Sequence, residues 1–266
     1  MQNIQKIDFH STSIRFAFQG VGLPVVLLHG YLESLEIWDN FADELSKNNL
    51  VIAVDLPGHG QSGLVDGKVT VEIMAEAVAQ VLDHLKIETA VIIGHSMGGY
   101  AVLAFAELWP DRLLGIGMFH SISWADLPEK KEARDREIEL IKQGKKDLIC
   151  NVNVPKSFAD DNLDKFSFQV EKAKEIAIKN TDEGIIAALN AMKSRNDRTS
   201  VLQNTKVPVF FAIGTKDNYI PIEKILNLTT LPAIKHIAIF ENSGHMAFIE
   251  EKEIAIDELS EFLGMC

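Results

Sequence analysis

Residues 89–98, Thr-Ala-Val-Ile-Ile-Gly-His-Ser-Met-Gly, decide the fold that the sequence predicts. The apolar run before Gly94 predicts a buried strand, and the run at 99–106 predicts a helix. Glycines two positions before and after Ser96 permit a turn too tight for a side chain at either flank. Such a turn lifts the serine hydroxyl clear of the sheet, at the N-terminus of the next helix, where negative charge is stabilised. Ser96 is therefore the candidate nucleophile.

Length and composition limit the classes of protein to consider. The 266 residues suffice for one large α/β domain or for a core with an inserted subdomain. The net charge of −12 disfavours nucleic acid and anionic membranes as partners. Cys150 and Cys266 form neither a disulfide framework nor a zinc-ligand pattern, so no metal and no cofactor are expected.

Targeting signals are not evident in the sequence. The first residues lack the apolar segment of a signal peptide, and no run approaches the roughly 18 apolar residues that span a bilayer. We therefore expect a cytoplasmic protein without stable membrane insertion, and a homodimer is compatible with the sequence.

Apolar periodicity along the chain predicts alternating strands and helices. Residues 4–10 and 13–18 predict a hairpin, and further strands are expected at 25–28, 51–54, 89–93, 113–119, 207–213 and 236–240. Helices are expected at 35–47, 71–85, 99–106, 129–143, 168–180, 182–193 and 246–263. The sequence predicts a mostly parallel, doubly wound α/β sheet with an N-terminal hairpin and an inserted helical cap. Residues 1–120 and 205–266 would form the core, and residues 121–204 the cap.

A serine hydroxyl becomes a good nucleophile when a base takes its proton and a third group orients that base. His245 lies just past the last predicted strand, and Asp217 lies just past the preceding one. The carboxyl ends of parallel strands are where sites assemble in open α/β sheets, so these two residues are the candidate base and acid. His10, His84, His95 and His236 are expected to have packing or surface roles.

The tetrahedral intermediate of acyl transfer needs amide donors aimed at its oxyanion. The turn that contains His29 and Gly30 follows a predicted strand and would direct the amide of Tyr31 inward. The amide of Met97, at the start of the helix after Ser96, is the second candidate donor. His29 itself is expected to stabilise the turn.

The motifs at 27–31, 55–62, 94–98, 214–217 and 244–245 resemble, in order and spacing, those of the α/β-hydrolase superfamily, in its branch with a helical cap after the sixth strand. The resemblance covers nearly the whole chain. It implies that Ser96 is the nucleophile, Asp217 the acid and His245 the base. It further implies that the amides of Tyr31 and Met97 form the oxyanion hole and that residues 55–62 form a structural turn.

The substrate pocket is expected between the cap and the catalytic residues. An apolar pocket with few polar groups would suit a small or medium acyl chain. Alternatively, the cap phenylalanines form the cap's own core. The pocket candidates are His29, Tyr31, Leu32, His120, Trp124, Phe158, Phe166, Phe168 and Tyr219.

The predicted function is hydrolysis of a small to medium carboxylic ester, thioester or lactone through an acyl-enzyme intermediate. Because the resemblance places serine where dehalogenases and epoxide hydrolases of the superfamily carry aspartate, those reactions are disfavoured. Two alternatives stay open: a carbon–carbon bond hydrolase or perhydrolase with the same triad, and a ligand-binding sensor on a hydrolase scaffold. Asp126 is an alternative acid, because some relatives carry theirs after the sixth strand.

Overall fold

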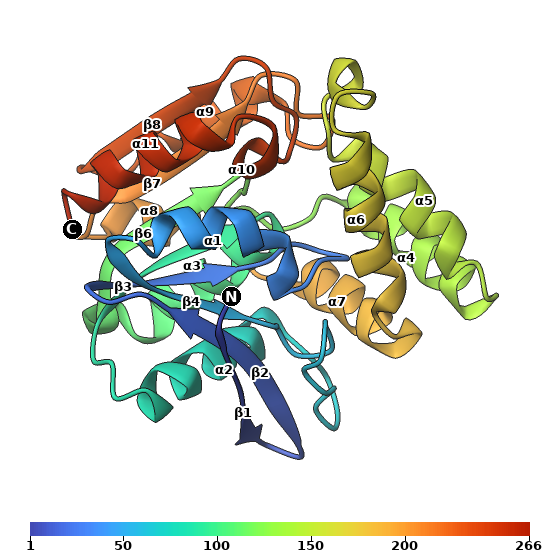
Figure 1. Ribbon diagram of the computed structural model, residues 1–266. Coiled ribbons are helices and arrows are strands. Elements are labelled where there is room, and N and C mark those ends of the chain that lie inside the picture. The colour runs from blue at the N-terminus through green and yellow to red at the C-terminus, as the bar shows by residue number, and fades with distance from the viewer.

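Six parallel strands, β3 to β8, make up most of an eight-stranded sheet in the computed structural model, which describes residues 1–266 (Figure 1). The predicted N-terminal hairpin is present as β1 and β2, and β2 pairs antiparallel with β4. The order across the sheet is β1-β2-β4-β3-β5-β6-β7-β8, which confirms the predicted fold class. The strands are β1 (Asn3–Phe9), β2 (Thr12–Gln19), β3 (Leu23–Leu28), β4 (Asn49–Val54), β5 (Ala90–His95), β6 (Leu113–Phe119), β7 (Val209–Gly214) and β8 (Lys235–Phe240).

Helices cover both faces of this sheet. On one face α1 (Asp39–Leu45) contacts α11 (Lys252–Leu263); on the other, α3 (Met97–Leu108) contacts α2 (Val71–His84) and α8 (Thr199–Asn204) (Figure 1). Strands β5 and β7 are consequently buried along their whole length. This double coverage explains why the central strands read as unbroken apolar runs.

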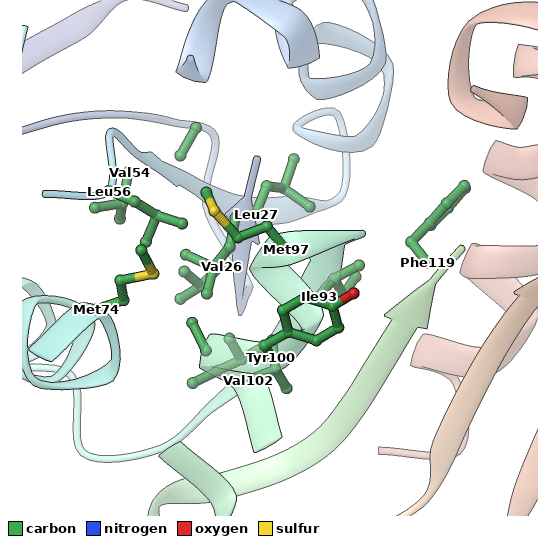
Figure 2. Packing of buried hydrophobic residues seen from close by; sticks show 14 of the residues in the cluster. Val26, Leu27, Val54, Leu56, Met74, Ile93, Met97, Tyr100, Val102 and Phe119 are labelled. Atoms are coloured by element: carbon green, nitrogen blue, oxygen red, sulfur yellow. The ribbon is translucent and has the colours of Figure 1, made fainter. Parts of the chain in front are cut away.

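The helix that follows Ser96 is held in place by the central core. Figure 2 shows Met97 and Tyr100 of α3 together with Val26 and Leu27 of β3 and Ile93 of β5. All five belong to one continuous cluster of buried apolar residues. Close packing of this kind resists displacement, so the start of α3 has a fixed position relative to the strand ends.

The predicted helical cap is formed by the chain between β6 and β7, and it extends from one end of the sheet (Figure 1). Its long helices are α4 (Pro128–Lys142), α5 (Lys146–Lys156), α6 (Ser167–Lys179) and α7 (Asp182–Ser194). Helices α5 and α8 are additional to the prediction. Pro155 lies inside α5, in its last turn, and proline usually marks a helix boundary.

Two predicted helices differ in detail from the structure. The helix expected at 35–47 begins as the 3₁₀ helix η1 (Leu35–Trp38). The helix expected at 246–263 is divided at Glu251, which has a non-helical φ of −132° and ψ of 48°. Its carboxylate binds the amide of Asn242 and the hydroxyl of Ser243, polar contacts that apolar periodicity does not reveal.

None of the helices is long and apolar enough to cross a bilayer. The remaining elements are short. These short elements are η2 (Pro110–Arg112), η3 (Asp160–Asn162), α9 (Ile222–Leu228) and α10 (Ala247–Glu250).

Candidate active site

Ser96 stands at the tight turn between β5 and α3, with a φ of 49° and a ψ of −111°. A positive φ is costly for a residue with a side chain and is typical of functional turns. A Cβ on Gly94 would lie 2.2 Å from the carbonyl carbon of Gly98, and a Cβ on Gly98 would lie 2.5 Å from the carbonyl oxygen of Leu28. The two glycines are therefore required by close backbone contact, as the sequence predicts.

His245 and Asp217 meet at the carboxyl ends of β8 and β7. His245 Nδ1 lies 2.6 Å from Asp217 Oδ2, and the amides of Tyr219 and Ile220 donate to Asp217 Oδ1 at 2.7 and 3.0 Å. Burial raises the pKa of Asp217, but the charge and the hydrogen bond of His245 lower it by more, so that it lies well below its ordinary value. The carboxylate is thus ionised and holds the Nδ1 proton of His245.

His120 lies next to Asp217, on the side away from the cavity. It is fully buried, and its Nε2 accepts a hydrogen bond from the amide of Ala247 at 3.3 Å. The proton is therefore on Nδ1, which lies 3.6 Å from Asp217 Oδ2. Burial lowers the pKa of His120 to about 4, so the ring is neutral near pH 7. The sequence predicts His120 as a pocket residue, whereas the structure places it behind the acid.

The candidate oxyanion donors are the amides of Tyr31 and Met97. Neither amide donates to a protein acceptor, so both are free to bind an oxygen of a ligand. The turn that carries Tyr31 is fixed by Glu33, whose Oε2 accepts from the amide of Gly30 at 2.5 Å. Met97 holds the first position of α3, where the helix dipole favours negative charge.

A cavity of about 390 Å³ lies between the core and the cap, and Ser96 and His245 both line it. The predicted pocket residues Tyr31, Leu32, Trp124 and Tyr219 also line it. Five other candidates are absent from its lining: His29, His120, Phe158, Phe166 and Phe168.

The structure explains why these pocket candidates lie outside the cavity lining. His29 is fully buried, and its Nε2 accepts from the amide of Leu56 at 3.0 Å, so it joins two turns as a stabilising residue. Phe158 belongs to the single continuous hydrophobic core, and Phe166 packs partly buried against it, so neither forms a separate core of the cap. The side of α6 that carries Phe168 faces solvent, and this residue is 76% exposed.

The cavity is more polar than the sequence predicts. Only 14 of its 27 lining residues are hydrophobic, and the charged ones come mostly from the cap. Asp126, the alternative acid, also lines the cavity, but it is held by the guanidinium groups of Arg134 and Arg195. These groups leave Asp217 as the carboxylate that contacts His245.

Several supporting residues escape sequence analysis because their side chains bind ring or backbone groups that no local pattern identifies. Glu33 binds His95, and Glu250 binds the amides of Gly244 and Met246 on either side of His245. No short motif marks these pairs. A metal ion could be considered at His120, Asp217 and His245, whose donor atoms lie within 4.8 Å of one another. However, the 2.6 Å hydrogen bond between His245 and Asp217 already joins two of these donors.

Comparisons with known proteins agree with this fold. Residues 24–136 match a family described as alpha/beta hydrolase fold. An esterase from Thermogutta terrifontis, solved with malate bound, is 29% identical, with 98% of each chain covered and a TM-score of 0.92. An enol-lactonase from Burkholderia xenovorans LB400 is 21% identical and shares the fold, with a TM-score of 0.90 over 98% of this chain and all of that one.

A curated relative is the dihydrolipoyllysine-residue acetyltransferase component of the acetoin cleaving system of Pseudomonas putida, which is 28% identical over 246 residues. The match covers 91% of this chain but only 64% of that protein's length. The fold is that of the α/β-hydrolase superfamily, whose family model and solved structures this chain matches. Within it, the likeness to an esterase supports hydrolase activity.

Proposed function

We propose that the protein is a serine hydrolase that cleaves small to medium carboxylic esters, thioesters or lactones through an acyl-enzyme intermediate. The observation that carries this proposal is the meeting of Ser96 and His245 at one cavity, with Asp217 hydrogen-bonded behind His245. Nucleophile, orienting acid and base follow the carboxyl ends of β5, β7 and β8, in the chain order Ser, Asp, His of other hydrolases of this fold.

In the first half of the reaction, Ser96 Oγ attacks the carbonyl carbon of the ester and transfers its proton to His245 Nε2. The carbonyl oxygen becomes an oxyanion, which the amides of Tyr31 and Met97 stabilise. When the tetrahedral intermediate collapses, the bond to the alcohol oxygen breaks and His245 gives the proton to the leaving alcohol. The acyl group remains bonded to Ser96.

In the second half, water attacks the acyl carbon while His245 Nε2 takes a proton from it. The bond to Ser96 Oγ then breaks, the serine recovers its proton from His245, and the carboxylic acid leaves. Asp217 stabilises the imidazolium of His245 in both halves, because its depressed pKa keeps it ionised at neutral pH.

The cavity supports a substrate of small to medium size. A volume of about 390 Å³ lies at the lower end of the range typical of small-molecule sites. The esterase of T. terrifontis and the enol-lactonase of B. xenovorans are named for ester and lactone chemistry, which favours the same reaction here. We assign residues 1–120 and 205–266 to the catalytic core and residues 121–204 to a cap that selects the substrate.

The test combines a covalent probe with a substrate panel. A fluorophosphonate should label the wild-type protein. The same protein should hydrolyse 4-nitrophenyl esters of acids from acetate to decanoate. Ser96→Ala should abolish both signals, and Ser260→Ala, an exposed serine on α11, should change neither. Activity that survives Ser96→Ala would rule the proposal out. Turnover of vinylogous diketones alone would favour a carbon–carbon bond hydrolase, and peracid formation alone would favour a perhydrolase. Tight ligand binding without turnover would favour a ligand-binding sensor.

A further inference from the structure

Three lysines from three different helices line the mouth of the cavity. Lys130 is near the start of α4, Lys156 ends α5, and Lys224 lies on α9. None of the three has a carboxylate within 4.0 Å of its ammonium group. This local concentration of cations occurs in a chain whose net charge is −12.

Two of these ammonium groups lie beside the same aromatic ring. Lys156 Nζ is 5.1 Å and Lys130 Nζ is 5.9 Å from the centre of the Tyr219 ring. The Tyr219 ring centre is in turn 5.3 Å from that of His245. The Tyr219 ring is therefore next to both of these ammonium groups and next to the candidate base. One small substrate could contact all of them.

The acidic groups of the cavity have other hydrogen-bond partners and form no ion pair with these lysines. Asp126 is bound by two guanidinium groups, and Glu33 by the ring of His95 and the amide of Gly30. The carboxylate of Glu137 accepts from the hydroxyl of Tyr31 and the amide of Asn153.

Tyr219 does not supply a negative charge either. Burial raises the pKa of its phenol well above the ordinary value, and the hydroxyl donates to the carbonyl oxygen of Asn153 at 2.8 Å. The three ammonium groups thus have no ion-pair partner within 4.0 Å and can bind an anionic ligand.

We propose that Lys130, Lys156 and Lys224 form a subsite for a carboxylate, so that the preferred substrates are esters or lactones that carry a second, ionised carboxyl group. This inference rests on the proposed hydrolysis at Ser96 and specifies its substrate class. The susceptible carbonyl lies at Ser96, and the free carboxylate extends along Tyr219 toward the cap. Two like charges beside one ring repel each other, and a bound anion relieves that repulsion.

The experiment compares substrates that differ in charge and little in shape. 4-Nitrophenyl hydrogen adipate and 4-nitrophenyl heptanoate present acyl chains of similar length, one ended by a carboxylate and one by a methyl group. A second pair, 4-acetoxybenzoate and methyl 4-acetoxybenzoate, places the carboxylate on the alcohol side. For at least one pair, kcat/KM should favour the anion about tenfold, the size expected of a charge-assisted contact.

The combined variant Lys130→Met, Lys156→Met, Lys224→Met keeps the side-chain length and removes the charge. It should lower the ratio of anionic to neutral kcat/KM about tenfold, with most of the change in KM. Lys131→Met is the matched control, because Lys131 is an exposed neighbour on α4 outside the cavity lining. It should leave the ratio unchanged.

The two levels of the proposal fail in different ways. Hydrolysis of both neutral esters without any preference for either anion would overturn the carboxylate subsite alone. An anionic preference that persists in the triple variant, or that Lys131→Met reduces equally, would overturn the assignment to these lysines. Absence of turnover for all four esters, together with no fluorophosphonate labelling, would overturn the proposed hydrolysis itself.

Discussion

Glu33 and His95 are joined by a buried hydrogen bond of 2.9 Å between Oε2 and Nδ1. The other ring nitrogen of His95 faces the carbonyl oxygen of His245 at 2.9 Å, so both nitrogens face acceptors. Burial raises the pKa of Glu33, but His95 and the amide of Gly30 lower it below its ordinary value. Glu33 and His95 thus form a buried hydrogen-bonded pair beneath the active site, with an ionised carboxylate as acceptor.

We predict that Glu33→Gln lowers the free energy of unfolding by about 2 kcal/mol, because it removes the charged acceptor of a buried hydrogen bond. Urea denaturation measures this change. The matched control is Glu76→Gln, which removes an exposed contact of the same chemistry, 3.2 Å from His10. Its effect should stay below about 1 kcal/mol. Equal losses in the two variants would contradict a stabilising role of the buried pair.

The same pair links two parts of the site. Glu33 holds the amide of Gly30, next to the candidate oxyanion donor, and His95 holds the carbonyl of His245. Glu33→Gln should therefore also slow fluorophosphonate labelling of Ser96 in protein that remains folded.

Asp217→Asn should lower kcat by about 10⁴, as the equivalent change does in serine proteases, because the asparagine amide stabilises the wrong tautomer of the histidine. Asp126→Asn should instead lower stability, since Arg134 and Arg195 lose their shared carboxylate. Ester kinetics and urea denaturation of both variants separate the two roles. A large loss of kcat in Asp126→Asn with little loss in Asp217→Asn would make Asp126 the acid.

The stability of the protein should depend on His120 in mildly acidic solution. Burial lowers the pKa of this residue to about 4 from its ordinary value of 6.5. Between these values the unfolded chain binds the proton and the folded protein does not, so the free energy of unfolding falls as the pH falls from 6.5 to 4. Below about pH 4 both states bind the proton, and the decline from this group ends.

His120→Gln keeps an oxygen that can accept from the amide of Ala247 and removes the titration. Over pH 4 to 6.5, its slope of unfolding free energy against pH should be smaller by about 1 kcal/mol per unit. His59, whose pKa burial lowers to about 3, is present in both proteins and cancels in the comparison. Urea denaturation at several pH values measures the slopes, and parallel slopes would contradict the assignment to His120.

The sequence was sufficient to predict the sheet, the inserted cap and the meeting of Asp217 with His245. These features depend on local rules, namely apolar periodicity, the glycines around Ser96 and the position of polar residues after strands. Backbone contact distances at Gly94 and Gly98 show the same steric requirement that the spacing indicates.

The lining of the cavity could not be predicted in the same way. The cap helices pack against one another as well as against the core domain. The orientation of each helix decides whether a given side chain lines the cavity or packs in the core. Phe158 is fully buried and Phe168 is exposed, although both are cap phenylalanines. The lysines at the mouth read as ordinary surface charges in sequence, because only the folded chain brings α4, α5 and α9 together.

Glu250 should set the position of His245, because its carboxylate binds the loop on both sides of that residue. It accepts from the amides of Gly244 and Met246 at 2.9 and 3.3 Å, and from the amide of Ala159 at 2.8 Å. In Glu250→Gln, one oxygen becomes an NH₂ donor that must face these N–H donors. Donor facing donor cannot hydrogen-bond, so the loop should shift.

We expect Glu250→Gln to lower kcat about tenfold or more, since a misplacement of about 1 Å can cost 10²-fold in rate. KM for a short neutral ester should change less than kcat, because the lining of the cavity stays in place. Glu253→Gln, on the exposed face of α11, is the control and should retain full activity. Ester kinetics and the rate of fluorophosphonate labelling report the position of His245 independently of substrate binding. If Glu250→Gln matched Glu253→Gln in both measurements, the carboxylate would have no part in placing the base.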